Sequence, residues 1–378
     1  KMNNFNRSIA IVTSIPLNEP VIRNRIFPFI EKLQENGFKV RLICLENNFL
    51  SENLIKNIHT EKIRVNYKKT KNFVSRFFKE SMIALKLLKQ AKLSQDEIIF
   101  ITIPSMFLSF FAPLYIKDRD ILLDVRDLTW EYLSSNSKFQ HYTKLFFRFL
   151  FKKSTPYFKV ISVTNKTELK YISNIYPKDK IVLVSNGVRL NQFQELIEVS
   201  PSTENKFTVT YIGNIGLAQN LETLIDAAKI LPKIQFRIVG SGVEFNKIKS
   251  LIHQHSLKNI ELTGSVSWNQ VIHYYNTTHV LYAQLTPNFS GAMPSKLYEY
   301  LATGKYIIYG GQGQARQSLK DFENCQVIKP CNPKLLANAI FEAKMSFKES
   351  YISSKNKEII KNNYIRETQV DKFIKKIL

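Results

Sequence analysis

Residues Thr286–Gly304 read TPNFSGAMPSKLYEYLATG, and this stretch decides the interpretation of the whole chain. A loop of small residues ends at Pro294, and the run that follows predicts a helix from Ser295 to Ala302. Gly304 is a typical helix stop, and the apolar run Tyr306–Tyr309 predicts a strand directly after it. The stretch therefore has the loop–helix–strand order of a parallel α/β protein.

The start of this predicted helix suits a phosphate group. The N–H groups of a first helical turn have no partner inside the helix, and the helix dipole favours an anion there. Lys296 adds a positive charge, and Glu299 lies about one turn later on nearly the same face. A diphosphate held by the amides and Lys296, with sugar hydroxyls held by Glu299, would make a nucleotide-sugar site. An ordinary helix–strand unit of another α/β protein is the alternative.

The segment PSKLYEYLATGK resembles the donor-site motif of family 4 glycosyltransferases, which are retaining enzymes of the GT-B fold. It is most similar to the bacterial branch that builds O-antigen and capsule polysaccharides. The resemblance implies an α/β chain of two Rossmann-like domains that face each other across a cleft. In relatives the second of two glutamates holds the ribose hydroxyls, and Glu299 matches it. The first glutamate touches the transferred sugar, but Gly291 stands there, so the amides of Gly291–Met293 are candidates for that role.

A second glycine-containing loop occurs in YIGNIGLAQN, residues 211–220. Gly213 and Gly216 follow a predicted strand and permit close approach of a phosphate. The string resembles the diphosphate loop of the same family, although most relatives carry Arg and Lys where this chain has Asn214 and Gln219. The resemblance implies a donor site formed by Gly213, Asn214, Gly216, Gln219, Gly240, Val266, Gly291, Ala292, Met293, Ser295, Lys296, Leu297 and Glu299.

Charged residues also end a predicted strand in DILLDVRDLTW, residues 120–130. The carboxyl ends of parallel strands are where α/β sheets bind ligands. The DVRDL segment is similar to a strand-end motif of the same bacterial branch. We expect catalytic roles for Asp124, Asp127 and Lys296, and contacts with the acceptor from Asn18 and Arg126. An Asp–Arg ion pair that only fixes the loop is the alternative.

The length and composition favour two folded domains, because the chain has 378 residues of which 44% are hydrophobic. We expect an N-terminal acceptor domain over residues 1–190, completed by a C-terminal helix at about 357–378. The donor domain is expected over residues 191–356. The polar segment Gln192–Asn205 is predicted to be the linker between them.

The formal net charge is +23, which indicates a partner with negative charge. Nucleic acid and an anionic membrane surface are the two candidates, and the absence of a nucleic-acid motif favours the membrane. Val74–Leu93 and Tyr142–Phe158 are predicted basic amphipathic helices, the second with a stripe of Lys144, Arg148 and Lys152. Solvated lysines on helices that pack in the core are the alternative.

Cofactor and membrane-span signals are absent from the sequence. The three cysteines and six histidines show no metal-ligand spacing, so we expect a metal-independent protein from a reducing compartment. No run of roughly 18 apolar residues predicts a membrane span. The expected location is cytoplasmic and peripheral, on the inner face of the cell membrane.

The resemblance therefore implies an enzyme that moves a hexosyl or N-acetylhexosaminyl group with retention. The expected donor is a nucleoside-diphosphate sugar, with UDP as the nucleotide, and the acceptor is lipid-linked or an oligosaccharide of a bacterial surface polysaccharide. The alternative is a non-catalytic GT-B-like protein that binds a nucleotide or polysaccharide. Gly291, Asn214 and Gln219 motivate that alternative, because each departs from the family pattern.

Overall fold

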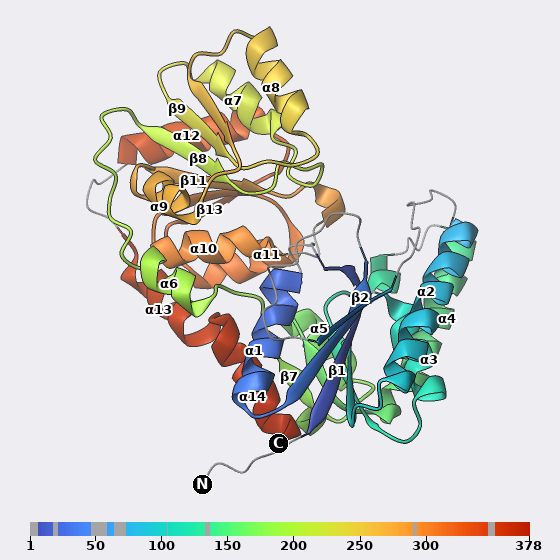
Figure 1. Ribbon diagram of the computed structural model, residues 1–378. Helices are drawn as coiled ribbons and strands as arrows, with labels where there is room; N and C mark the ends of the chain where they lie inside the picture. The colour runs from blue at the N-terminus through green and yellow to red at the C-terminus, as the bar shows by residue number, and fades with distance from the viewer. Residues whose placement is uncertain are drawn as a thin grey trace. The chain divides into compact units, whose positions relative to one another are not determined.

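The computed structural model describes residues 7–17, 22–46, 59–63, 73–103, 105–132, 137–289, 293–346 and 352–378. The chain forms two compact α/β units (Figure 1). Unit 1 comprises Lys1–Asn186 and Arg366–Leu378, and unit 2 comprises Gly187–Ile365. Each unit has its own parallel sheet with helices on both faces, which is the doubly wound arrangement of Rossmann-like domains.

The sheet of unit 1 has the strand order β3-β2-β1-β4-β5-β6-β7, and every strand pair is parallel. Its central strands are almost continuously apolar, as expected for strands that are covered on both faces. The bounds are β1 Ser8–Pro16, β2 Lys39–Leu45, β3 His59–Ile63, β4 Ile98–Ile103, β5 Asp120–Val125, β6 Phe158–Val163 and β7 Ile181–Leu183.

Two groups of helices cover this sheet. One core layer contains α2 (Phe73–Leu93), α3 (Met106–Tyr115), α4 (Lys138–Ser154) and α5 (Lys166–Ser173). The opposite layer contains the π-helical turn η1 (Ile22–Ile26), α1 (Phe27–Glu35) and α14 (Arg366–Ile377). The ring of Phe373 in α14 lies 5.3 Å from that of Phe29 and 5.0 Å from that of Phe100. The C-terminal helix is therefore part of the core of unit 1.

The sheet of unit 2 has the order β10-β9-β8-β11-β12-β13, again all parallel. From β8 the chain adds β9 and β10 on one side, and from β11 it adds β12 and β13 on the other side. The strand order therefore reverses between β8 and β11, and such a reversal point is where sheets of this kind bind nucleotides. The strands are β8 Thr208–Ile212, β9 Gln235–Val239, β10 Ile260–Gly264, β11 Val280–Gln284, β12 Tyr306–Gly310 and β13 Cys325–Ile328. The helices are α6 Leu190–Leu196, α7 Glu222–Ile230, α8 Phe245–Gln254, α9 Trp268–Asn276, α10 Ser295–Thr303, α11 Gly313–Ser318, α12 Pro333–Ser346 and α13 Ser354–Asn363.

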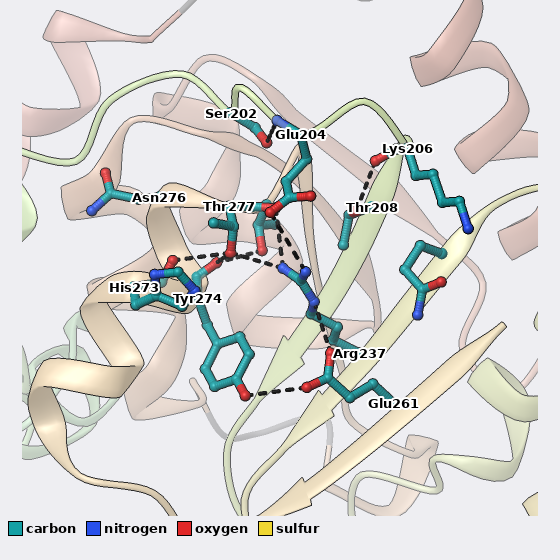
Figure 2. Close-up of polar contacts among 12 residues, drawn as sticks. Ser202, Glu204, Lys206, Thr208, Arg237, Glu261, His273, Tyr274, Asn276 and Thr277 are labelled. Atoms are coloured by element: carbon teal, nitrogen blue, oxygen red, sulfur yellow. Dashed lines mark hydrogen bonds and ion pairs between the residues drawn. The ribbon is translucent and has the colours of Figure 1, made fainter.

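A polar network around Arg237 of β9 ties α9 to this sheet (Figure 2). The guanidinium donates from Nε to Glu261 on β10 at 3.0 Å, and from Nη1 to the hydroxyl of Thr277 at 2.7 Å. It also lies over the ring of Tyr274, 5.6 Å from its centroid. These partners all belong to unit 2, so the network holds the C-terminal end of α9 against β9 and β10.

Two predicted segments differ from the structure. The helix predicted at Tyr142–Phe158 is α4 at Lys138–Ser154, because the hydroxyl of Ser137 accepts from Gln140 N and starts the helix earlier. Pro156 then lies in a short 3-10 turn before β6. Gln192–Asn205 was predicted to be a linker, but it begins within α6 and buries Phe193 and Leu196 in the core of unit 2. Apolar residues one turn apart in a polar segment were the signal for that helix.

Candidate nucleotide-sugar site

The loops that leave β8 and β11 meet at the reversal point of the unit 2 sheet. The backbone N–H of Thr286, after β11, donates to the carbonyl oxygen of Ala218 in the loop after β8 at 2.8 Å. The side chain of Gln284 donates to the carbonyl oxygen of Gln219 at 2.9 Å. The two sequence motifs are therefore joined by hydrogen bonds within one unit.

The helix predicted from TPNFSGAMPSKLYEYLATG is confirmed as α10, which follows directly on Pro294. Gly304 ends it with a φ of 75°, in the left-handed region that favours glycine. The hydroxyl of Tyr300 accepts from the N–H of Ile212 at 2.7 Å and donates to the carbonyl oxygen of Ile212 at 3.0 Å. This buried double contact fixes α10 against the end of β8, where the glycine loop begins.

Lys296 and Glu299 lie beside this glycine loop. A Cβ placed on Gly213 would lie 3.6 Å from Cγ of Lys296, so the lysine side chain runs past the glycine. Nζ of Lys296 is 2.7 Å from Oε2 of Glu299. The hydroxyl of the fully buried Tyr275 donates to the same oxygen at 3.2 Å. Burial, together with the nearby carboxylate, raises the pKa of Tyr275 well above its ordinary value, so the hydroxyl keeps its proton and acts as a donor.

The glycine loop is closely packed. Gly240 has a φ of 139°, and a Cβ there would collide with the carbonyl oxygen of Gly213. A Cβ on Gly216 would lie 2.7 Å from Nδ2 of Asn214 and 2.9 Å from Oε1 of Gln219. These two neutral side chains therefore lie over Gly216, where relatives are expected to carry cations. Oε1 of Gln219 is buried and has no hydrogen-bond partner in the described part of the chain.

The other predicted donor-site residues differ in their surroundings. Ser295 is the first residue of α10, and Val266 and Met293 pack partly buried against the core of unit 2. Leu297 is fully buried, and its N–H is bonded to the carbonyl oxygen of Pro294 at 3.0 Å, so it anchors the helix from inside. Gly291 and Ala292 lie outside the described residues.

In unit 1, the structure places Asp124 in a buried ion pair. Its carboxylate lies at the end of β5 and is 1% exposed. Arg25 of the π-helical turn donates to both oxygens, from Nη2 at 2.6 Å and from Nε at 3.2 Å. The hydroxyls of Ser162 and Thr102 also donate to it, at 2.7 and 3.3 Å. These four contacts favour a structural role for Asp124 over the predicted catalytic one. An Asp–Arg ion pair was the alternative interpretation of this motif, and Asp124 does form one, with Arg25 as its partner.

Arg126 and Asp127 follow in the loop after β5, next to a carboxyl group that the motifs did not reveal. Burial lowers the pKa of Arg126, opposed by the charge of Asp124, and its Nη1 is buried without a hydrogen-bond partner among the described residues. Glu168 in α5 has a pKa raised to about 7, chiefly by burial and also by Asp127. Asn18 lies outside the described residues.

Three residues of these networks were missed by sequence reasoning: Arg25, Glu168 and Tyr275. Only Glu168 had a signal, because Asn165 three residues before it is a typical helix start, and its side chain does accept from Glu168 N. Within the described residues, no three His, Cys, Asp or Glu side chains lie together as metal ligands would.

Known sequences are similar to this chain, and the family match lies in the second unit. Residues 192–365 match the family model described as Glycosyl transferases group 1. An uncharacterized glycosyltransferase of Methanocaldococcus jannaschii is 24% identical over 194 residues, 49% of this chain and 52% of that protein. A putative colanic acid biosynthesis glycosyl transferase of Escherichia coli is 23% identical over 227 residues, 55% of each. The chain thus spans about half the length of the curated relatives it matches.

Solved structures match over nearly the whole chain. Sucrose-phosphate synthase from Thermosynechococcus elongatus has a TM-score of 0.74 at 16% identity, with 98% of both chains covered. HepE of Anabaena, solved with UDP and glucose, has a TM-score of 0.68 at 14% identity, with 98% of this chain and 99% of that chain covered. At these identities the likeness concerns the fold. Residues 192–365 therefore resemble the Glycosyl transferases group 1 model, within a chain that has the GT-B fold.

Proposed function

We propose that this chain is a glycosyltransferase whose unit 2 binds a UDP-sugar and transfers the sugar with retention of configuration. One observation carries the proposal: Lys296 and Glu299 lie next to the Gly213 loop, at the reversal point of the unit that resembles the group 1 glycosyltransferase model. In this proposal the N-terminus of α10 and Lys296 bind the diphosphate, and Glu299 accepts hydrogen bonds from the ribose.

The proposed reaction breaks the bond between the anomeric carbon and the diphosphate oxygen. The leaving nucleoside diphosphate gains negative charge as this bond breaks, and the helix amides with Lys296 stabilise that charge. The new bond forms between the anomeric carbon and an acceptor hydroxyl, which passes its proton to the departing diphosphate. Because Lys296 and the amides supply the positive charge, we propose that the transfer needs no metal ion, so that EDTA leaves its rate unchanged.

The acceptor in this proposal is a lipid-linked sugar or an oligosaccharide, and the pathway is the synthesis of a bacterial surface polysaccharide such as O-antigen or capsule. The transferred group is a hexose or N-acetylhexosamine. Support comes from the resemblance of the Thr286–Gly304 stretch to that branch and from the similarity to the colanic acid enzyme of E. coli. The chain would work at the inner face of the cell membrane, where such acceptors are exposed to the cytoplasm.

A nucleotide panel followed by a turnover assay tests the proposal. Thermal unfolding with UDP, GDP, ADP and CMP should show the largest rise of Tm with UDP, because a ligand of the native state stabilises it. Release of UDP from UDP-sugars, with and without an oligosaccharide acceptor, then separates an enzyme from a protein that only binds the nucleotide. Binding of UDP without release from any of these sugars would favour the non-catalytic alternative. No response to any nucleotide would contradict the proposed enzyme and would leave only the polysaccharide-binding form of the alternative.

A further inference from the structure

Large apolar side chains are exposed on two helices of unit 1. Phe139, Tyr142, Phe146 and Phe149 of α4 are each more than half exposed. Phe78 and Met82 of α2 are also more than half exposed. Soluble monomers rarely expose large groups of apolar side chains unless the surface binds something. We call this surface the α2/α4 face, formed by Phe78, Met82, Leu85, Phe139, Tyr142, Leu145, Phe146 and Phe149.

The two helices lie near each other in unit 1. Both pack against α3 on the same side of the sheet (Figure 1). The rings of Phe77 in α2 and Phe147 in α4 stack with their centroids 6.4 Å apart, and the exposed Phe78 and Phe146 are their immediate neighbours in the sequence. On α4 the exposed rings recur every three or four residues, while Phe147 is buried in the core. The apolar side chains of the face therefore point away from the unit.

Two of the three cations in the predicted basic stripe are paired with one carboxylate of unit 1. Arg148 donates to both oxygens of Glu131, each at 2.6 Å, and Nζ of Lys144 lies 3.2 Å from the same carboxylate. Burial raises the pKa of Glu131, but the hydrogen bonds from Arg148 and Lys144 outweigh it, so the carboxylate stays charged. These two cations are thus occupied within unit 1, and only Lys152 of the stripe is an exposed lysine without such a pair among the described contacts.

Other lysines surround the apolar side chains. The sequence of α2 contains five basic residues and one acidic residue, and that of α4 contains five basic residues and no acidic one. Six exposed lysines lie on these two helices: Lys86, Lys89, Lys92, Lys138, Lys152 and Lys153. An apolar strip flanked by lysines is the pattern of helices that lie in a membrane interface. No helix in the described ranges is long and apolar enough to cross a membrane.

We propose that the α2/α4 face docks on an anionic bilayer surface, with its aromatic rings among the headgroups and its lysines against anionic lipid. Charge complementarity supports this occupant, because anionic lipid attracts each lysine. A second copy of the chain would bring the same lysines against the first set, and like charges disfavour that contact. The inference rests on the exposed side chains and does not depend on the proposed catalytic activity.

Co-sedimentation of the full chain with vesicles tests the docking. Vesicles of neutral phosphatidylcholine should bind weakly, and vesicles containing phosphatidylglycerol should bind at least tenfold more tightly. The binding should weaken steeply with salt, because the Debye length falls from about 10 Å at 0.1 M to about 3 Å at 1 M. Equal binding to both lipids at low salt, or no binding to either, would overturn the proposal.

Matched variants separate this face from general surface effects. Tyr142→Ser/Phe146→Ser/Phe149→Ser should weaken binding at least tenfold, whereas Phe341→Ser/Met345→Ser on exposed positions of α12 should not. Likewise Lys152→Glu/Lys153→Glu should weaken binding more than Lys233→Glu/Lys249→Glu, which changes the net charge equally but lies in unit 2. Equal losses in the paired variants would overturn the assignment. So would a dimer in solution that the triple serine variant converts to a monomer without any loss of vesicle binding.

Discussion

Nζ of Lys296 lies 2.7 Å from Oε2 of Glu299, so the proposed diphosphate ligand and the proposed ribose ligand form an ion pair with each other. A diphosphate at the start of α10 would compete for the lysine, because its oxygens carry more negative charge than one carboxylate. Glu299 would then keep the hydroxyl of Tyr275, which is bonded to the same oxygen. We therefore expect donor binding to exchange the partners of Lys296 and to free Glu299 for the ribose.

Replacing the lysine tests this exchange. Lys296→Ala is expected to remove about 2–4 kcal/mol of transition-state stabilisation, which appears as a lower kcat/KM for the sugar donor. A clear part of this loss should lie in kcat. The measurement is steady-state release of UDP. Lys206→Ala, at an exposed lysine of the same unit, serves as the control. A folded Lys296→Ala protein with unchanged kcat and KM would show that the lysine does not contact the leaving group.

The second prediction concerns recognition of ribose. Glu299→Gln is expected to weaken binding of UDP and to reduce the preference for UDP over 2′-deoxy-UDP, because a charged acceptor of the ribose hydroxyls is lost. Tyr275→Phe should have a smaller effect in the same direction, since it removes only the hydrogen bond that orients Glu299. Calorimetric titration of the wild type and both variants gives, for each protein, the ratio of the dissociation constants of 2′-deoxy-UDP and UDP. A ratio that is equal in all three proteins would place the ribose elsewhere.

Much of the fold was predictable because its signals are local. Apolar runs such as Tyr306–Tyr309 indicate strands covered on both faces, and Gly304 marks the end of α10 by a backbone angle that favours glycine. The order of motifs along the chain also predicted that the candidate donor-site residues lie on the loops after parallel strands. These inferences need only the chemistry of neighbouring residues, and the structure confirms the strand and helix in each case.

Contacts between distant residues were not predictable in this way. Arg25 and Asp124 are separated by 99 residues, and nothing near either one identifies its partner. The outward face of α4 was equally hidden, because aromatic residues occur around the helix and only packing against α3 decides that Phe147 is buried and Phe146 exposed. Sequence periodicity shows that a helix is amphipathic, but the neighbouring elements determine which apolar residues belong to the core.

The ion pair between Arg25 and Asp124 gives a stability prediction that separates structure from catalysis. Asp124→Ala leaves a buried arginine charge without its partner, which is expected to cost about 3–5 kcal/mol in free energy of unfolding. Arg25→Met/Asp124→Leu should recover part of this loss, because it removes both charges. Urea denaturation of the three proteins measures both effects. A folded Asp124→Ala variant of normal stability that has lost turnover would instead support the catalytic role predicted from the sequence.

The last prediction concerns the pH dependence of unfolding. Burial raises the pKa of Glu168 from 4.5 to about 7, even though the backbone N–H and hydroxyl of Thr164 donate to its carboxylate at 2.9 and 2.8 Å. The folded state therefore holds the proton more tightly than the unfolded state does. Below pH 4.5 this group contributes its full stabilisation to the free energy of unfolding. As the pH rises through 7 that contribution is lost, and the total loss is up to about 3 kcal/mol.

Glu168→Gln keeps an acceptor for Thr164 but cannot titrate, so the free energy of unfolding of the wild type minus that of this variant should fall between pH 4.5 and 7.5. Urea denaturation at pH 4.5, 6.0 and 7.5 measures this difference. Glu358→Gln, at an exposed acid of α13, is the matched control for exchanging a carboxyl group for an amide. If the free energy of unfolding of the wild type minus that of Glu168→Gln is constant, or rises with pH, the carboxyl group is ionised in the folded protein. Its burial next to Asp127 would then require a compensating cation or solvent contact.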